Sequence, residues 1–134
     1  MQYEQDYIMR LIKQVIRALI GILLNKQTTL HYELPINRLQ TNGDDILQKI
    51  VLLADKGSIC EAENILIDEM ESGAESSIHT GLLFYDHINN YDDEFLEKHN
   101  FSRDEIKQGI LEISKLMGSY AMATAALSEN YRED

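Results

Sequence analysis

The side chains best suited to chemistry are four histidines, one cysteine and a run of acidic residues. His79 and His87 lie eight residues apart in a segment predicted to be helical, and Asp86 precedes the second histidine. Zinc ligands on one helix are commonly three or four residues apart, as in the H-E-x-x-H motif, which this sequence lacks. A separation of two helical turns therefore favours histidines at the surface. A metal site or an enzyme that uses His79, Asp86 and His87 is the least favoured alternative.

The acidic run from Asp86 to Glu97 contains enough oxygen atoms for calcium to be considered. A twelve-residue calcium loop that begins at Asp86 would end, as the motif requires, at Glu97. Its third position is Ile88, which offers no ligand, and Tyr91 occupies the position where the sharp turn needs glycine. We therefore expect these acidic residues to form caps and a turn between helices.

The single cysteine, Cys60, is predicted to lie in the first turn of a helix, where backbone N–H groups can lower a thiol pKa. A catalytic cysteine also needs a base, and no spacing in the sequence brings a histidine to Cys60. We expect a buried structural thiol. Phosphate-binding glycine loops, the G-x-S-x-G elbow and the dinucleotide fingerprint do not occur in the sequence. We therefore expect no catalytic residue, no cofactor and no metal ligand.

The charge balance excludes one large class of partner. The chain of 134 residues has 12 Lys and Arg against 23 Asp and Glu, and its net charge of −11 has the wrong sign for binding nucleic-acid phosphates. The N-terminal residues lack the charge order and the cleavage site of a secretory signal. The uncharged stretch between Arg17 and Lys26 is far shorter than the ~20 residues that span a bilayer. We therefore expect a cytoplasmic protein.

The elements that must position these residues are helices, and the longest is predicted over residues 3–24. One narrow stripe of this helix is polar and mostly basic, and it contains Asp6, Arg10, Lys13, Gln14, Arg17 and Gly21. Apolar side chains cover most of the remaining circumference, so the helix must be buried on at least two sides. Either the core of the chain or a second copy can cover it. The side chains expected at an interface between copies are Ile8, Leu11, Ile12, Val15, Ile16, Leu19, Ile22 and Leu23.

The rest of the chain is predicted to be a connector followed by a helical bundle. Residues 25–42 show no helical period and contain the only proline, so we expect a long connector there. Residues 44–128 are predicted to form the bundle, with a last helix that continues past Met117. Residues 1–134 thus make one all-α domain of about six helices.

Residues 44–72 resemble half of a tetratricopeptide repeat. Two helices of about a dozen residues meet at Gly57, and Ala62 follows five positions later, where a small residue lets paired helices approach closely. One such unit can be argued, whereas a solenoid needs about three. We therefore expect a tetratricopeptide-like hairpin within a small bundle. Capping boxes are predicted at Ser58 and Ser102.

Three segments carry a wider resemblance: residues 6–13 (DYIMRLIK), 57–64 (GSICEAEN) and 95–106 (FLEKHNFSRDEI), of which the last is the most specific. Over residues 3–117 the chain resembles an uncharacterised family of small helical proteins from low-GC Gram-positive bacteria. The resemblance implies one domain in the cytoplasm and implies no activity.

These features favour a non-catalytic protein–protein interaction or scaffold module that self-associates through its N-terminal helix. A homo-oligomer is expected, and an additional protein partner is left open. The first alternative is a membrane-surface adaptor, in which the basic amphipathic helix 3–24 leaves the bundle. Interfacial helices usually keep a larger polar face than this one, so a membrane partner is less favoured. The second alternative is the metal protein or enzyme considered above.

Overall fold

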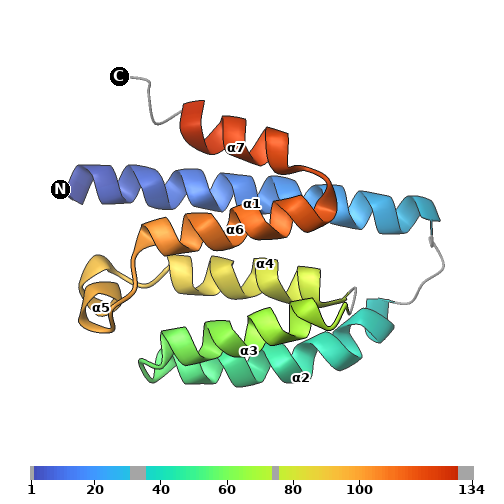
Figure 1. Ribbon diagram of the computed structural model, residues 1–134, viewed down its shortest axis with the longest axis horizontal. Coiled ribbons are helices and arrows are strands. Elements are labelled where there is room, and N and C mark those ends of the chain that lie inside the picture. Colours follow the sequence, from blue (N-terminus) through green and yellow to red (C-terminus); the bar gives the residue numbers. More distant parts are fainter. Residues whose placement is uncertain (1, 31–35, 74–75, 130–134) are drawn as a thin grey trace.

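The regular elements of the protein are all helices in the residues that its computed structural model describes, which are 2–30, 36–73 and 76–129. The predicted all-α class is therefore confirmed. The helices are α1 (Gln2–Leu30), α2 (Ile36–Asp55), α3 (Ile59–Glu71), α4 (Ser76–Asn89), α5 (Asp93–Lys98), α6 (Arg103–Met117) and α7 (Tyr120–Glu129) (Figure 1). These seven elements agree closely with the expected number of about six.

The predicted connector over residues 25–42 is wrong for most of its length. α1 continues to Leu30 and α2 already begins at Ile36, while residues 31–35 lie outside the described part of the chain. The expectation rested on local helix breakers, and one of them, Gly43, lies inside α2. Glycine in a helix interior costs only about 1 kcal/mol relative to alanine. Extending a helix that has already formed adds a backbone hydrogen bond for each residue fixed, so an isolated breaker does not end it.

The C-terminal helix, predicted to run without interruption, is divided at Gly118. This glycine adopts a left-handed conformation with φ of 75°, which residues with a side chain seldom adopt. The N–H of Ser119 donates to the carbonyl oxygen of Ser114 at 2.8 Å, as at many helix ends that stop on glycine. α7 therefore turns back from α6 and packs against both α6 and α1.

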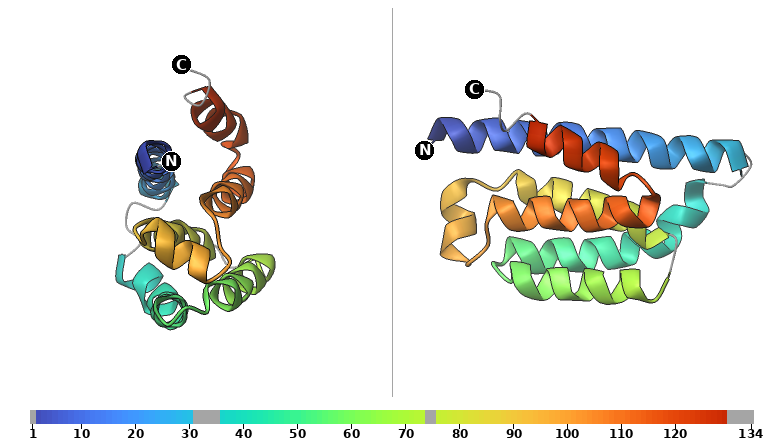
Figure 2. Two further views of the ribbon diagram at one scale, coloured as in Figure 1. Left: turned by 90° about the vertical axis from the view of Figure 1, so that its left-hand side faces the viewer. Right: turned by 45° about the horizontal axis from the view of Figure 1, so that its top comes forward.

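The helices form three stacked pairs, which Figure 2 shows from the end of the bundle. α2 pairs with α3, α4 pairs with α6, and the N-terminal α1 pairs with the C-terminal α7. α4 lies in the middle of the stack, because it packs against α1, α2, α3 and α6. The outer pairs, α1–α7 and α2–α3, therefore form opposite ends of the molecule (Figures 1 and 2).

α1 lies in the core of a single chain, where α4, α6 and α7 pack around it. Its buried apolar side chains are Leu11, Ile12, Val15, Ile16, Leu19 and Leu23. Two further side chains, Ile8 and Ile22, are partly buried against the same core. These are the eight residues expected at an interface between copies, and that assignment needs correction for the six buried ones. The chain covers them itself, because it supplies three helices around α1.

α2 and α3 lie against each other as a hairpin around Gly57, and Ala62 is fully buried within it. Ser58 precedes α3, but its side chain accepts no capping hydrogen bond, so the capping box predicted there is not formed. Ser102 does cap α6, because its hydroxyl accepts from the backbone N–H of Glu105 at 3.3 Å, which is the N-cap half of the predicted box.

The guanidinium of Arg103, a residue that is only 6% exposed, joins the start of α6 to the turn between α4 and α5. Its Nη1 atom donates to the carbonyl and side-chain oxygens of Asn89 at 2.8 and 3.1 Å. Its Nη2 atom donates to the carbonyl oxygen of Tyr91 at 2.8 Å and to the carboxylate of Asp93 at 3.0 Å. Asn89 in turn donates to the carbonyl oxygen of Met9 in α1 at 2.9 Å. This network holds α1, α4, α5 and α6 together at one end of the bundle.

We predict that Arg103→Met lowers the free energy of unfolding by about 3 kcal/mol, because it leaves buried carbonyl oxygens without donors. Arg103→Lys should recover only part of this loss, since one ammonium group cannot reproduce the planar fork that serves Asn89 and Tyr91 together. Urea titration measures the difference. Lys115→Ala is the control: this exposed lysine makes a surface pair with Glu112 at 3.3 Å, so a change above about 0.5 kcal/mol would be unexpected.

A second prediction concerns Gly109, where a β-carbon would overlap the ring of Tyr85. Because Tyr85 is buried and its ring cannot move without disturbing the core, Gly109→Ala should lower the free energy of unfolding by about 2 kcal/mol. Gly21→Ala is the matched control, since nothing lies near the β-carbon there. That change should raise the free energy by about 0.5–1 kcal/mol through helix propensity. Equal effects at the two glycines would contradict the close packing of α4 on α6.

Candidate functional site

Of the three residues considered for a metal site, Asp86 and His87 interact with other side chains. His87 donates through Nε2 to the Asp55 carboxylate of α2 at 2.9 Å. Asp86 lies 3.8 Å from the ammonium of Lys13 in α1. His79 is partly buried on the same helix, α4, while His31 falls outside the described residues. Within the described ranges, no group of three or more His, Cys, Asp or Glu side chains is arranged to hold a metal ion.

An aromatic ladder lies at the corner where α2, α4 and α5 meet. The rings of His87 and Tyr91 have centroids 5.5 Å apart, those of Tyr91 and Phe95 are 4.6 Å apart, and those of Phe95 and His99 are 4.5 Å apart. The Tyr91 hydroxyl donates to the Asp55 carboxylate, and His99 donates through Nδ1 to the carbonyl oxygen of Phe95 at 2.9 Å. The ladder connects α5 to the end of α2. The Tyr91 hydroxyl and the Nδ1 atom of His99 are both used in these internal hydrogen bonds.

Asp55 is the anionic centre of this corner. Partial burial alone would raise its pKa, but the hydrogen bonds from His87 and Tyr91, together with the nearby His87 ring, lower the pKa of Asp55 below its ordinary value. Burial and the same carboxylate raise the pKa of Tyr91. Asp55 is therefore held as a carboxylate and Tyr91 as a phenol, which is the protonation that the hydrogen bond between them requires.

The predicted caps in the acidic run are confirmed. The Asp92 carboxylate accepts from the backbone N–H of Phe95 at 2.9 Å and caps α5. Asp93 binds Arg103, as described above. Asn100, which follows α5, has a positive φ of 58°, as expected for a residue that stops a helix. Two of the carboxylates that suggested calcium, Asp92 and Asp93, are thus engaged in a helix cap and in the ion pair with Arg103.

Cys60 differs from its expectation, because its side chain is exposed. Although the side chain is exposed, partial desolvation of the thiol raises its pKa, and the negative charges of Glu105 and Glu63 raise it further. The thiol is therefore held in its protonated form, whereas a nucleophilic cysteine needs the thiolate.

The same region contains a half-buried carboxylate. Glu63 accepts a hydrogen bond from the buried Tyr85 hydroxyl at 2.7 Å. Burial raises the pKa of Glu63, the hydrogen bond from Tyr85 opposes this, and the charge of Glu105 adds to it, so the net shift is upward. Burial and Glu63 also raise the pKa of Tyr85. Three helices, α3, α4 and α6, therefore bring acidic and phenolic groups together here.

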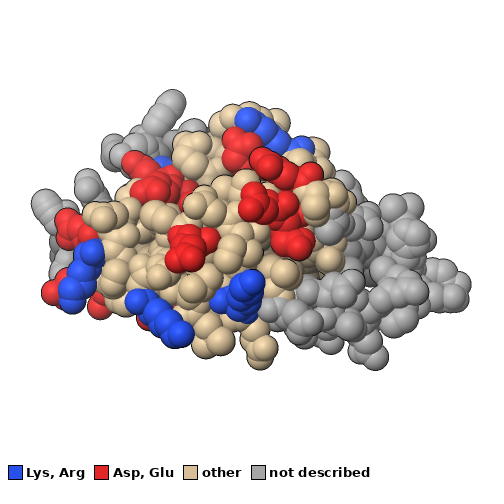
Figure 3. Space-filling model, turned by 60° about the horizontal axis from the view of Figure 1, so that its bottom comes forward, with Lys and Arg blue, Asp and Glu red and all other residues tan. Residues whose placement is uncertain are grey.

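The surface charge is distributed unevenly between the two ends of the stack. α3 contains five acidic residues and no basic one: Glu61, Glu63, Asp68, Glu69 and Glu71. In a view with the α2–α3 side turned forward, acidic side chains are spread over much of the surface, and basic ones lie at its lower border and at its top (Figure 3). The acidic charge of α3 at this end of the molecule therefore repels other acidic surfaces.

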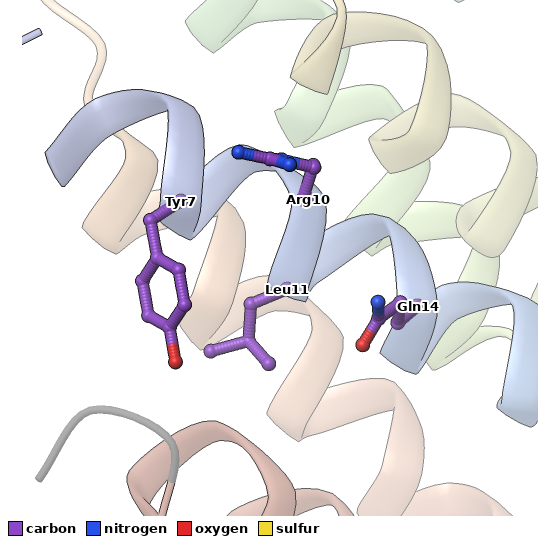
Figure 4. A pocket seen from close by; sticks show the side chains of 4 residues that line it. All are labelled: Tyr7, Arg10, Leu11 and Gln14. Carbon is purple, nitrogen blue, oxygen red and sulfur yellow. The ribbon is translucent and has the colours of Figure 1, made fainter. Parts of the chain in front are cut away.

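The opposite end presents the polar stripe of α1. Arg10, Gln14 and Arg17 are exposed, and they share the outer side of the helix with Tyr7 and Leu24, which are 43% and 45% exposed. Tyr7, Arg10, Leu11 and Gln14 line an open pocket of about 260 Å³, in which Tyr7 and Leu11 point to the same side (Figure 4). This outer side of α1, rather than its apolar face, is the part of the helix that faces solvent.

The sequence alone suggested no role for Arg103, and it suggested a role for the outer stripe of α1 only in the membrane-surface alternative. A signal for Arg103 was present: an arginine in the first turn of a helix opposes the helix dipole, which favours acidic residues there. For α1, the polar stripe itself was the signal, since residues that avoid the core must face outwards. None of the described helices is both long and apolar enough to cross a bilayer.

Two carboxyl groups are predicted to give opposite pH dependences. The folded-state pKa of Asp55 is lowered, so its charge stabilises the fold above its ordinary pKa of 3.8, and this contribution is lost as the pH falls. Asp55→Asn should therefore unfold more easily than the wild type at pH 7. The difference should close as the pH falls below 3.8.

The folded-state pKa of Glu63 is raised, so its charge opposes folding above its ordinary pKa of 4.5. Glu63→Gln, which keeps an acceptor for the Tyr85 hydroxyl, should be more stable than the wild type at neutral pH and lose that advantage on acidification. Urea titrations from neutral to acidic pH measure both variants, and shifts of the same sign would contradict the two assignments.

Comparison with known proteins identifies a family and gives no activity. Residues 2–118 match a family described as "Family of unknown function (DUF6483)". No curated protein and no solved structure matches the chain. The match covers the α1 stripe, α3 and the Arg103 network, so these features all lie within the family region. The chain therefore belongs to this family of unknown function.

Proposed function

We propose that the protein is a non-catalytic protein–protein interaction or scaffold module that self-associates through α1. The observation that carries the proposal is the outer side of α1, where exposed basic, amide and apolar side chains surround the open pocket. Such mixed surfaces, in which arginine and tyrosine accompany apolar contacts, are typical of association sites. The proposed interface is thus moved from the apolar face of α1 to its outer side.

The groups with chemical potential support the non-catalytic part of the proposal. Asp55, His87 and Tyr91 satisfy one another, and Asp93 binds Arg103. The Cys60 thiol is disfavoured as a nucleophile because its pKa is raised. The first four of these groups connect helices, and the Cys60 thiol is kept in its less reactive protonated form.

We also infer a tetratricopeptide-like character for the α2–α3 hairpin and a cytoplasmic location for the protein. The close packing of α2 on α3 around Gly57 and the buried Ala62 support the hairpin proposal. The single cysteine, which cannot form a disulfide within the chain, supports the location. A membrane-surface adaptor is less favoured, since α1 would first have to withdraw buried side chains such as Ile12 and Leu19 from the core.

We predict that light scattering gives a mass above that of one 15.4 kDa chain at high protein concentration, with a fall towards it on dilution. Glutamate at Ile12 or Leu19 would be a poor test, because both side chains are fully buried and the change would unfold the protein. Tyr7→Ser with Leu24→Ser is the better variant, because it removes exposed apolar surface and should reduce the mass while the fold is kept.

The control for this measurement is Leu52→Ser, which removes a still more exposed apolar side chain (58%) from α2 at the other end of the stack. Circular dichroism checks that each variant is folded. A single-chain mass at every concentration would refute self-association. If such a monomer also sedimented with anionic vesicles, the membrane-surface adaptor would replace the proposed function.

A further inference from the structure

The charge of each helix limits how two copies of this acidic protein can meet. With a net charge of −11, copies repel one another unless a positive surface meets a negative one. Among the described helices, α1 alone has a net positive charge, with four basic and two acidic residues. α3 is the most negative, with five acidic residues and no basic one. The attractive arrangement of two copies therefore brings α1 of one towards α3 of the other.

The two helices cannot satisfy each other within one chain. α1 belongs to the outer pair at one end of the stack and α3 to the outer pair at the opposite end (Figures 1 and 2). Arg10 and Arg17 are exposed on α1, and Glu61 and Asp68 are exposed on α3. These charges are therefore directed outwards and are available to a second molecule.

The spacing of the exposed polar residues matches between the two helices. On α1 three neighbouring residues of the exposed stripe, Arg10, Gln14 and Arg17, lie at intervals of four and three residues, and Asp6 precedes them on the same stripe. On α3, taken in the reverse direction, it is Asp68, Asn64 and Glu61, again with intervals of four and three. Seven residues of helix rise about 10.5 Å, so both stripes have the same length and lie along one side of their helix.

We propose that α1 of one copy packs antiparallel against α3 of a second copy, with Arg10 opposite Asp68, Gln14 opposite Asn64 and Arg17 opposite Glu61. This inference rests on the proposed self-association and specifies its second surface. Each arginine then meets a carboxylate, and each amide meets an amide, in a single register. In the parallel orientation the intervals no longer coincide.

Apolar side chains flank both stripes. Tyr7 and Leu24 are exposed on α1, and Ile67 is 37% exposed on α3. Exposed ion pairs contribute little by themselves and are screened by salt, so the contact is weak and sensitive to ionic strength. The contact joins two different surfaces, so a bound copy still offers one free surface of each kind. The assembly is therefore expected to grow with concentration beyond a dimer.

The test is a charge exchange between the two stripes. Arg10→Glu with Arg17→Glu makes the α1 stripe acidic, and Glu61→Lys with Asp68→Lys makes the α3 stripe basic. Each double variant should be monomeric by analytical ultracentrifugation, since its two stripes now carry like charges. An equal mixture of the two variants should associate again, because each then offers the complement of the other. A chain with all four changes should self-associate like the wild type.

Two controls separate this register from the overall charge. Lys49→Glu with Lys56→Glu alters the net charge as much as the α1 variant does, at exposed positions in α2 and just beyond its end, and should keep most of the association. Raising the ionic strength from about 0.01 M to about 1 M shortens the screening length from about 30 Å to about 3 Å and should dissociate the wild type. Circular dichroism confirms the fold, and Arg17→Glu mixed with Glu61→Lys serves if a double variant is unfolded.

The outcomes distinguish the inference from the proposed function. Monomeric variants that associate on mixing support the α1–α3 contact. Variants that associate as the wild type does, or a mixture that stays monomeric, would overturn this contact while self-association of the wild type stands. A wild type that is monomeric at all concentrations would overturn both.

Discussion

The coverage of α1 is the constraint on which the rest of the structure depends. An apolar helix of this length is stable in water only if other elements remove most of its surface from solvent. Here the chain places α4, α6 and α7 around it, and residues such as Ile12, Ile16 and Leu19 are completely buried. The N- and C-terminal helices consequently lie side by side and complete the stack. The polar stripe of α1 is left facing solvent, which is why the proposed contact uses this side of the helix.

Polar groups set the geometry of one end of this core. The buried Arg103 guanidinium is neutralised by Asp93 and bonded to carbonyl groups of the turn before α5, and Asn89 extends the network to α1. Burying a charge is costly unless it is paired and hydrogen-bonded, so the geometry of this corner tolerates little variation. The ladder of Tyr91, Phe95 and His99 lies beside it. Several side chains in the acidic run, Asp86, Asp92 and Asp93 among them, thus have structural partners.

The separation of charge along the stack links the fold to its proposed role. The pairing of α1 with α7 at one end and of α2 with α3 at the other keeps the basic and acidic stripes apart. Had α1 packed beside α3, the charges would have neutralised each other within the chain. Because they are apart, both stripes remain accessible to a second copy, as the proposed contact between α1 and α3 requires.

Local patterns in the sequence determined the helical class, the caps at Asp92 and Ser102, the helix stop at Asn100 and the need to bury the first helix. Each of these depends on residues a few positions apart, so periodicity and capping chemistry can be recognised in the sequence without knowledge of the fold. The tertiary structure alone decided what covers α1, how far α1 and α2 extend, and where Glu63, Tyr85 and Arg103 find partners. Those outcomes depend on contacts between residues far apart in the chain. The amphipathic pattern of a helix indicates that one face must be buried, but it does not indicate which other helix will cover that face.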